Sequence, residues 1–434
     1  MSNIKARLLK GFRDLLPCDA IIKEKFLSNI KNTFENYGFS PIYTPALEYI
    51  DILTGKGGDE NEKLMYRFQD NGQRDVGMRY DLTVPLARFV ALHKNELNFP
   101  FKRYHIAPVW RAENTQKGRY REFYQCDCDI VGSDSVLSDV EIVSLINNTL
   151  SNLKIEDFLI KINSRVFVDF LFNIMKLDEE GKKKTAILMD KKDKLPIKVF
   201  DDELEKLLNN EQINIINEYF LIDNIDSLQK FMSKLEIIPD ELKNEIDKFK
   251  KIFEYCLFMN KHLKFDPLII RGLDYYTGIV FETVLVESPQ YGAIFSGGRY
   301  DGLVSLFTGE KIPAIGASIG ISRLITALEE RDFFGEKKNT VSDVIIFNLD
   351  EKIQSKYLDI ACIFRKENIK TDIYHENAKM KKQFKYAEKN GYRFAVIIGE
   401  DENEKNILKL KDLKNFSEKE ISLEHAVREI LSTF

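Results

Sequence analysis

Arginines, carboxylates and phenols gather at three separated places in this 434-residue chain. One is the turn 271–278, which reads Arg-Gly-Leu-Asp-Tyr-Tyr-Thr-Gly and follows the apolar run 268–270. A second is the stretch 110–125, and a third runs from Gly316 to Arg323. Guanidinium groups stay protonated and present a planar fork that matches phosphate oxygens. The three places together predict a folded chain that gathers its arginines around one polyphosphate.

The arginines also have a plainer interpretation, because a lone arginine is more often part of a surface or structural ion pair. The candidates for phosphate contact are Arg111, Arg121, Arg271 and Arg323. Each lies in a turn or on a polar strand face beside glycine or aromatic residues, so as a set they favour a phosphate site. Phe123 could stack on a purine ring, although a strand phenylalanine more often belongs to a core.

Carboxylates and an amide near these stretches could recognise an ammonium group or a ring nitrogen. They are Asp81, Gln125, Asp129 and Asp274. Pairing with neighbouring arginines is the competing explanation for the carboxylates. The segment 296–302 reads Ser-Gly-Gly-Arg-Tyr-Asp-Gly, so its backbone could approach a ligand closely and Tyr300 adds a hydroxyl. A simple tight turn explains these glycines equally well.

Common cofactor signatures are missing from the sequence. It contains neither the phosphate-binding loop nor the dinucleotide fingerprint. Cys126 and Cys128 are expected to pack in a core, and no second Cys or His pair provides zinc spacing. The five histidines form no triad or metal spacing. We therefore assign no metal ligand and no catalytic histidine.

Two alternating segments, 101–111 and 121–131, must position much of this chemistry. In both, the odd positions carry the charged groups and the even positions are mainly apolar. Successive side chains of a strand point to opposite faces. A loop centred near Gln116 would place Arg111 opposite Arg121 and bring the two polar faces together. The sequence therefore predicts an antiparallel hairpin with one chemical face and one core face.

Other elements follow from local patterns. Apolar residues recurring every fourth position predict a helix from 19 to 38, and the strand expected over 39–43 suits a sheet edge because Pro45 follows it. Asn71-Gly72 predicts a hairpin turn. The segment 165–260 has a dense helical charge pattern and is expected to be a helical insertion.

Length and charge limit the architecture and the partners. A chain of this length, 44% hydrophobic, suits two or three domains. Its 64 basic and 69 acidic residues give a net charge of −5, so nucleic acid would have to bind a local patch. The segment 331–340 is a plausible linker, and the short apolar strands after it predict a small α/β unit with a parallel sheet over 341–434.

The compartment can also be inferred. Five cysteines without a disulfide framework indicate a reducing environment. No stretch approaches the ~18 apolar residues of a membrane span, and we see no export signal. We expect a cytoplasmic protein that does not bind a membrane.

The residues singled out above resemble those of the class II histidyl-tRNA synthetase family, essentially end to end. The turn 271–278 is similar to the histidine-specific signature of that family. The segment ending at Pro45 resembles the dimer-forming first class motif, 110–132 the second and 315–324 the third. Two positions depart from the family pattern. Asp81 stands where many bacterial members have Glu, and Ser322 precedes Arg323 where the third motif usually has Glu.

The resemblance implies an α+β catalytic domain over 1–330, built on a mainly antiparallel sheet and carrying the helical insertion at 165–260. A small α/β anticodon-binding domain would follow at 341–434, and the chain would form a homodimer. The implied reaction is activation of L-histidine by ATP, with Mg²⁺ held largely by the phosphates, followed by transfer of histidine to tRNA(His).

Residue roles also follow from the resemblance. Arg111 and Arg271 would contact the α-phosphate and act in catalysis, Arg323 would contact the outer phosphates and Phe123 the adenine. With Arg121 they form the ATP set. The residues implied for histidine are Asp81, Thr83, Gln125, Asp129, Tyr275, Tyr276 and Tyr300.

Two other functions remain open at the level of sequence. One is a non-catalytic histidine sensor similar to the synthetase-like regulatory subunit of ATP phosphoribosyltransferase, a family that lacks the terminal anticodon-binding domain. The other is a plain RNA-binding regulator, which would bind tRNA without activating histidine. The α/β tail and the full arginine set favour the synthetase.

Overall fold

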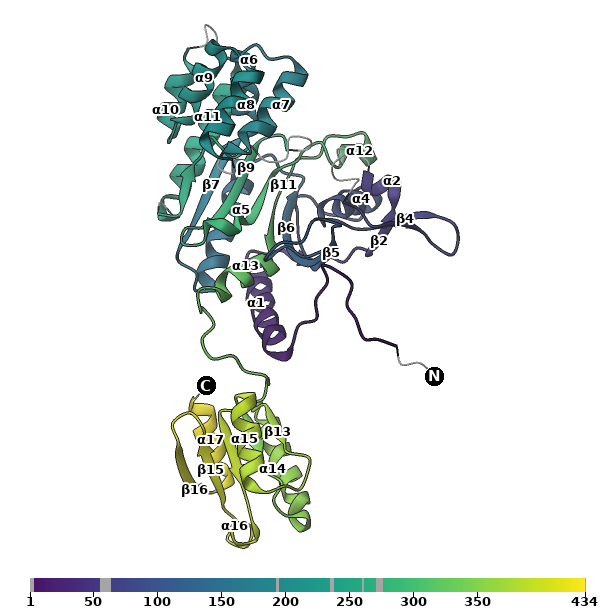
Figure 1. The fold of residues 1–434 in the computed structure, drawn as a ribbon, viewed down its shortest axis with the longest axis vertical. Helices are drawn as coiled ribbons and strands as arrows, with labels where there is room; N and C mark the ends of the chain where they lie inside the picture. The colour runs from purple at the N-terminus through teal and green to yellow at the C-terminus, as the bar shows by residue number, and fades with distance from the viewer. Residues whose placement is uncertain are drawn as a thin grey trace. The chain divides into compact units, whose positions relative to one another are not determined.

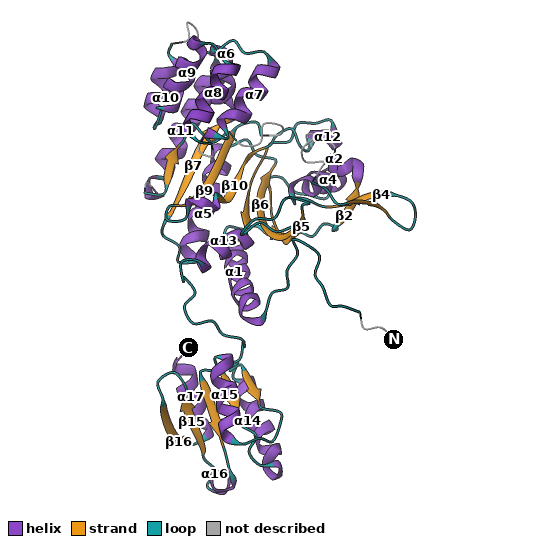
Figure 2. Ribbon diagram, viewed as in Figure 1, coloured by secondary structure: helices purple, strands orange, loops and turns teal. Residues whose placement is uncertain are grey.

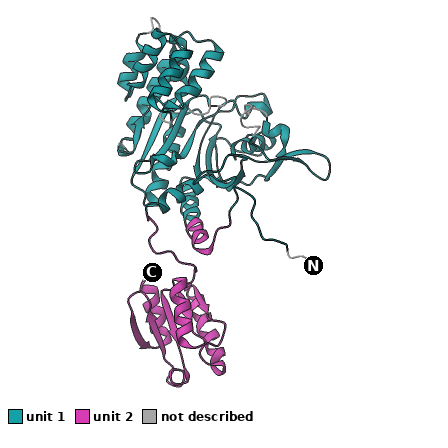
Figure 3. Ribbon diagram, in the orientation of Figure 1, with its two compact units in different colours: residues 1–13, 26–331 teal, residues 14–25, 332–434 magenta. Residues whose placement is uncertain are grey.

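The computed structural model describes residues 4–54, 64–192, 195–234, 238–259, 261–270 and 276–433. The chain divides into two compact units (Figure 3). The larger comprises Met1–Arg13 and Phe26–Arg331, and the smaller comprises Asp14–Lys25 and Asp332–Phe434. Among the described helices, none combines the length and the apolar character needed to cross a membrane.

A mixed, mainly antiparallel sheet is the framework of the larger unit (Figure 2). Its described strands follow the order β1 (Ser40–Pro41), β5 (Phe101–Trp110), β6 (Glu122–Val131), β11 (Ala314–Gly320), β10 (Ala293–Arg299), β9 (Ile279–Leu285), β7 (Phe158–Ser164) and β8 (Leu263–Phe265). The outermost pairs, β1 with β5 and β7 with β8, are parallel, and the other pairs are antiparallel. The predicted sheet type is confirmed, and the segment before Pro45 lies at the sheet edge as expected.

The hairpin of β5 and β6 has the predicted register. Cross-strand pairs run from Phe101 opposite Val131 to Trp110 opposite Glu122. Beyond the last pair, the backbone N–H of Arg111 donates to the carbonyl of Arg121 at 2.9 Å. The alternation and the loop centre were sufficient for this prediction because a period of two determines every pair once one pair is known.

Helices lie against the sheet of the larger unit (Figure 1). The helices α5 (Val136–Asn152) and α13 (Ile321–Glu329) pack against its strands, and α1 spans Pro17–Asn36. The helix α4 (Thr83–His93) packs beside α2 (Ile50–Thr54) and α12 (Ser305–Thr308). A small sheet of β2 (Leu47–Tyr49), β4 (Asp75–Met78) and β3 (Arg67–Gln69) lies next in sequence to α2. Its β3–β4 hairpin turns at Asn71-Gly72, as predicted.

The helical insertion occupies the connection between the parallel strands β7 and β8. Its described helices are α6 (Arg165–Ile174), α7 (Glu179–Met189), α8 (Ile197–Leu207), α9 (Asn210–Phe220), α10 (Ile225–Met232) and α11 (Asp240–Tyr255), followed by the short η2 (Leu257–Met259). Side chains that accept backbone N–H groups begin several of them, including Ser164, Asp178 and Asn209. Figure 1 shows these helices bundled together beyond one end of the strands.

The smaller unit is an α/β layer structure. Its sheet has the order β13 (Thr371–Ile373), β12 (Val344–Ile346), β14 (Phe394–Ile397), β15 (Leu408–Asp412) and β16 (Ser417–Ile421). Its helices are α14 (Gln354–Lys366), α15 (Met380–Asn390), α16 (Glu400–Glu404) and α17 (Leu423–Thr433). Alternate residues of β12 enter separate cores, Val344 and Ile346 on one face and Ile345 on the other.

The three strands predicted for this unit form the expected parallel sheet, but the sheet continues with two strands that were not predicted. The strands β12, β13 and β14 are parallel, whereas β15 and β16 are antiparallel. The sequence Ser-Glu-Lys-Glu-Ile of β16 is almost entirely exposed, so it has no apolar face that would reveal a strand. Edge strands of this charged kind resist pairing with other chains.

Candidate active site

A cavity of about 450 Å³ opens in the larger unit, where α4, the β5–β6 hairpin, β10, β11 and the start of α13 approach one another. Predicted site residues that line it are Asp81, Thr83, Arg111, Phe123, Gln125, Tyr276 and Arg323. These residues are spread over more than half of the chain, so the fold brings together groups that the sequence keeps apart. Its lining combines cations, a carboxylate, an amide and aromatic rings.

Arg111 is held at the loop end of the β5–β6 hairpin. Its Nε donates to the carbonyl of Tyr80 at 2.8 Å, and its guanidinium lies 5.1 Å from the ring centroid of Phe123. The carboxylate of Glu113 lies 3.9 Å from Nη1. A backbone acceptor, an aromatic face and a nearby acid restrain this cation in one orientation. A restrained guanidinium suits an anion whose position must be controlled.

Asp81 precedes α4 and uses its carboxylate as a local cap. Oδ1 accepts the backbone N–H of Val84 at 3.1 Å. Burial raises the pKa of the Asp81 carboxyl, while the N–H of Val84 and the positive charge of Arg111 oppose that shift. A cationic ligand group in the cavity would favour the ionised form in the same way. This carboxylate is therefore suited to receive an ammonium group.

Gln125 presents an unused acceptor to the cavity. Its Nε2 donates to Ser318 Oγ at 2.7 Å across the β6–β11 pair. Its buried Oε1 has no hydrogen-bond partner among the residues that the structure describes. Buried polar atoms are almost always satisfied, so an unpaired acceptor on a residue that lines a cavity suits a donor on the ligand. An imidazole N–H is a donor of this kind.

The far wall comes from the third predicted site. Arg323, in the first turn of α13, donates from Nη1 to the carbonyl of Ala293 at 2.6 Å. Ser322 and Gly320 also line the cavity beside it. The predicted contribution of 316–323 to the cavity is thus made by Ser318, Gly320, Ser322 and Arg323.

Comparison with known proteins gives two family matches. Residues 11–324 match the model of histidyl-tRNA synthetase, and residues 343–433 match that of an anticodon binding domain. The chain belongs to the histidyl-tRNA synthetase family. The resemblance inferred from the sequence is confirmed.

Individual relatives agree with this membership. The histidine–tRNA ligase of Treponema denticola is 41% identical, with 98% of each chain covered, and that of Helicobacter hepaticus is 42% identical, with 95% of each covered. The crystal structure of histidyl-tRNA synthetase from Nostoc sp. PCC 7120 matches with a TM-score of 0.91 at 31% identity over the whole of both chains.

A more distant structure shares the fold. It is described as an ATP phosphoribosyltransferase regulatory subunit/histidyl-tRNA synthetase from Bacillus halodurans, with a TM-score of 0.76 at 19% identity. The match covers 91% of this chain and 99% of the chain in that structure. At this level of identity the likeness concerns the fold alone.

Three predicted site residues do not line the cavity of this synthetase-family chain. Arg121 donates to the carbonyls of Glu113 at 3.2 Å and Lys10 at 3.4 Å. Asp129 forms a buried ion pair with Arg103 at 2.7 Å and accepts the hydroxyl of Tyr300. Arginine pairing, the alternative considered for Asp129, is thus present in the structure. Arg271 and Tyr275, also predicted, lie outside the described residues.

Glycines of the segment 296–302 and of the third predicted stretch serve close packing of strands. A Cβ on Gly316 would stand 1.8 Å from Asp129 Oδ1, and one on Gly297 would stand 2.0 Å from the carbonyl oxygen of Gly316. No side chain fits at those distances. The turn interpretation of these glycines is therefore too simple, because they let β10, β11 and the Asp129 carboxylate approach one another.

Several cavity residues were not assigned individually from the sequence. They are Glu113, Arg119, Tyr120, Ser296 and Ser318. Arg119 and Tyr120 belong to the β5–β6 loop, where strand alternation ends and the direction of a side chain can no longer be predicted. Ser318 sits among small residues of β11 that have no marked pattern. Their only sequence signal was membership of the segments 110–125, 296–302 and 316–323.

Proposed function

We propose that this cavity holds histidine and ATP side by side while the chain activates the amino acid. The overall reaction is the ATP-dependent joining of histidine to tRNA, as family membership over nearly the whole chain requires. The observation that carries the assignment of the cavity is the pairing of a restrained cation, Arg111, with an unused buried acceptor, Gln125 Oε1.

We assign the carboxylate-rich side to histidine. The residues proposed for it are Asp81, Thr83, Gln125, Asp129, Tyr275, Tyr276 and Tyr300. Asp81 suits the α-ammonium group, and Gln125 suits the imidazole. Apolar amino acids would leave these buried polar groups unpaired, which disfavours them strongly without an editing site. Asp129 and Tyr300 do not line the cavity, and their role would be to stabilise the histidine side through the hydrogen bond between them.

We assign the arginine side to ATP. The residues proposed for it are Arg111, Arg121, Phe123, Arg271 and Arg323. Arg111 and Arg271 would contact the α-phosphate as catalytic residues, Arg323 the outer phosphates, and Phe123 the adenine ring. Arg121 would act by holding the loop that ends in Arg119 and Tyr120, because its own guanidinium contacts backbone carbonyls.

The proposed chemistry has two steps and needs no protein nucleophile. A carboxylate oxygen of histidine attacks the α-phosphorus of ATP in line, the bond to the β-phosphate oxygen breaks, and histidyl-adenylate and pyrophosphate form. A terminal ribose hydroxyl of tRNA then attacks the adenylate carbonyl, and AMP leaves. The residues align two anions and stabilise charge that spreads over the phosphate oxygens, a task for restrained guanidinium groups.

Mg²⁺ fits this site as a companion of ATP. Among the described residues no group of three or more His, Cys, Asp or Glu side chains could hold a metal ion by itself. The phosphates would therefore supply most ligands, and Glu113 in the cavity wall offers a carboxylate. When bound, the ion would neutralise part of the phosphate charge.

The partners follow from the same proposal. Residues 343–433, which match an anticodon-binding model, would contact tRNA(His). We also propose a homodimer and a cytoplasmic location, the latter supported by five cysteines that form no disulfide. The domain limits proposed from the sequence are 1–330 for catalysis, with the insertion at 165–260, and 341–434 for the anticodon.

Exchange of radioactive pyrophosphate into ATP tests the proposed activation step. Exchange should depend on histidine and should stay near background with each of the other amino acids. A chain that binds histidine without any exchange would instead be a sensor, and one that binds only tRNA would be a regulator. The match of 343–433 to an anticodon-binding model and the histidine–tRNA ligase relatives over nearly the whole chain favour the synthetase over the sensor.

A further inference from the structure

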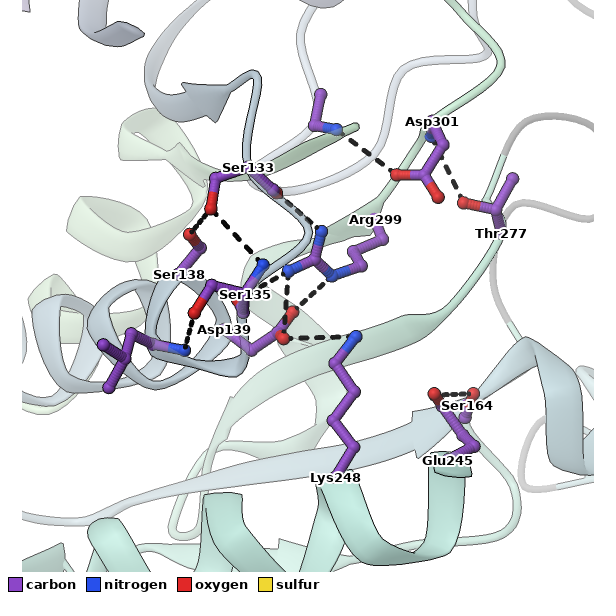
Figure 4. A network of polar contacts seen from close by, with 12 residues as sticks. Ser133, Ser135, Ser138, Asp139, Ser164, Glu245, Lys248, Thr277, Arg299 and Asp301 are labelled. Carbon is purple, nitrogen blue, oxygen red and sulfur yellow. Dashed lines mark hydrogen bonds and ion pairs between the residues drawn. The ribbon is translucent and has the colours of Figure 1, made fainter. Parts of the chain in front are cut away.

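A buried cluster of charges joins the helical insertion to the main sheet at a place outside the cavity lining (Figure 4). Asp139, in the first turn of α5, has no exposed surface. It accepts two N–H groups of Arg299, at 2.7 and 3.0 Å, and its Oδ2 lies 3.3 Å from Lys248 Nζ of α11. Arg299 also donates to the carbonyls of Ser133 and Ser135, at 3.0 and 2.9 Å.

The insertion adds a second charge of its own. Glu245, on the same face of α11 as Lys248, is 8% exposed and accepts the hydroxyl of Ser164. Burial raises the pKa of the Glu245 carboxyl, and Lys248 opposes that shift. Asp139 and Glu245 thus face Arg299 and Lys248, two acids against two bases. Glu245 and Lys248 both belong to α11, so with both ionised the helix adds one charge of each sign, and Lys248 is the group that balances the second acid.

Arg299 connects this cluster to the histidine side of the cavity. Its carbonyl accepts the backbone N–H of Thr277 at 2.9 Å, and Thr277 Oγ1 accepts the N–H of Asp301 at 3.2 Å. A Cβ on Gly278 would stand 3.3 Å from Arg299 Cδ, so that backbone packs on the arginine stem. Thr277 directly follows Tyr276, a cavity residue, and Arg299 directly precedes Tyr300.

We propose that Lys248 is a positioning residue for histidine: by neutralising Asp139 it holds Arg299, and through Arg299 it holds the backbone beside Tyr276. The inference rests on the proposed assignment of Tyr276 and Tyr300 to histidine. It gives the helical insertion a role in substrate binding that is transmitted through buried charges.

The physical reason is electrostatic. Loss of Lys248 removes one of the two cations paired with Asp139 and the cation nearest Glu245, so these buried carboxyls must rearrange their contacts, admit water or take up a proton. That rearrangement reaches Thr277 through Arg299. Arg111 and Phe123 belong to a different hairpin and keep their own contacts. Histidine binding should therefore suffer more than ATP binding.

The test compares Lys248→Met with Lys251→Met, an exposed lysine on the same helix, in the full-length chain. Pyrophosphate exchange gives the KM for histidine and for ATP, and a thermal melt reports folding. For Lys248→Met we expect the histidine KM to rise ~5–30-fold, because small misplacements of binding groups can cost up to about 100-fold. We expect the ATP KM to change less than ~2-fold and Lys251→Met to match the wild type.

A conservative change separates positioning from general damage. Lys248→Arg keeps the charge and should recover most of the histidine KM. An unchanged histidine KM in folded Lys248→Met, or equal rises in both KM values, would overturn the inference. If Lys248→Met does not fold, Lys248→Gln, which keeps a neutral donor, provides the same comparison. Absence of histidine-dependent exchange in the wild type would instead refute the proposed function.

Discussion

At the scale of single residues, the cavity depends on side chains whose polar groups are only partly used within the protein. Arg111 donates a hydrogen bond from Nε to the carbonyl of Tyr80, and Gln125 donates one from its amide nitrogen to Ser318 Oγ. In each case an internal hydrogen bond restrains a side chain that lines the cavity. A restrained group costs less entropy when it binds a ligand, so both are pre-organised.

Replacement of Arg111 by alanine should reduce kcat/KM for pyrophosphate exchange by about 10²–10³-fold, the usual effect of losing one fixed group that stabilises transition-state charge. Arg111→Lys should also be poor, because an ammonium cannot present the planar fork. The matched control is Arg74→Ala, whose guanidinium pairs with Asp70 on an exposed hairpin. Exchange by Arg111→Ala at the rate of that control would contradict the assigned role.

Asp127 predicts a pH dependence of stability. Burial raises the pKa of this carboxyl to about 7, whereas in an unfolded chain it lies near ~4. Between these values the unfolded chain releases a proton that the folded chain retains, so this group's contribution to stability falls as pH rises from about 4 to about 7 and is constant above. The loss is about 1.4 kcal/mol per pH unit at most.

Asp127→Asn removes this titration and keeps a side chain of the same shape. Its melting temperature relative to wild type should therefore increase between pH 5 and pH 8. Thermal melts at several pH values measure the difference. The control is Asp134→Asn, an exposed residue in the loop after the same strand. A difference between Asp127→Asn and wild type that is the same at every pH would show that Asp127 does not titrate in this range.

At the scale of elements, the N-terminal segment 7–13 fastens the loop of the β5–β6 hairpin. The carbonyl of Gly11 accepts the backbone N–H of Arg121 at 2.9 Å. Arg13 donates to the hydroxyl of Tyr120 at 3.1 Å, and its guanidinium lies 4.1 Å from that ring's centroid. Since Tyr120 lines the cavity, this segment helps to shape the side proposed for ATP.

Gly11→Ala should raise the KM for ATP by ~3–10-fold while leaving that for histidine nearly unchanged. Gly11 has a φ of +87°, which costs a side chain about 1 kcal/mol or more, and an added Cβ would stand 2.7 Å from the stem of Arg121. The steric contact with Arg121 should displace the β5–β6 loop, which the backbone strain by itself would not do. Initial rates of exchange at varied ATP concentration measure the effect.

Gly38→Ala is the matched control for this prediction. Gly38 has a similar φ of +77°, but a Cβ there would meet only the end of Lys102, at 3.9 Å. It therefore carries the backbone strain without the contact to the loop. Equal ATP KM values for the two variants would show that segment 7–13 has no part in ATP binding.

At the scale of the whole molecule, we assign the contact of the proposed homodimer to exposed aromatic residues of the larger unit. Tyr43 is 81% exposed and Tyr49 is 52% exposed. Tyr49 lies opposite Val76, which in turn lies opposite the exposed Phe68, so an apolar row crosses the small sheet. Apolar surface of this kind is common where proteins associate. It supports the proposed homodimer.

The double variant Tyr43→Asp with Tyr49→Asp should sediment as a monomer at concentrations where the wild type has about twice the mass of one chain. Burying two carboxylates in an apolar contact is unfavourable. Phe416→Asp, which changes an equally exposed ring in the smaller unit, should leave the mass unchanged. Unaltered dimers in the double variant would place the dimer contact elsewhere.

The amino-acid pattern was sufficient to identify the family, which implied the sheet type, and to predict the register of the hairpin that carries Arg111. Register could be predicted because strand alternation has a period of two, and one assumed loop centre then sets every cross-strand pair. The helical insertion was also evident, since its charge pattern repeats with the helical period. The charged strand Ser417–Ile421 was missed because a strand exposed on both faces leaves no apolar pattern.

Which residues of one polar face line the cavity could not be predicted from the sequence and became clear from the folded structure. Gln125 and Asp129 lie on the same face of β6, yet Gln125 lines the cavity while Asp129 pairs with Arg103 behind it. Likewise, Arg111 and Arg121 lie opposite each other in one hairpin. Only the guanidinium of Arg121 donates to the carbonyls of Lys10 and Glu113, and it does not line the cavity. Alternation specifies the side of a strand, whereas burial and bonding partners are set by segments distant in the chain.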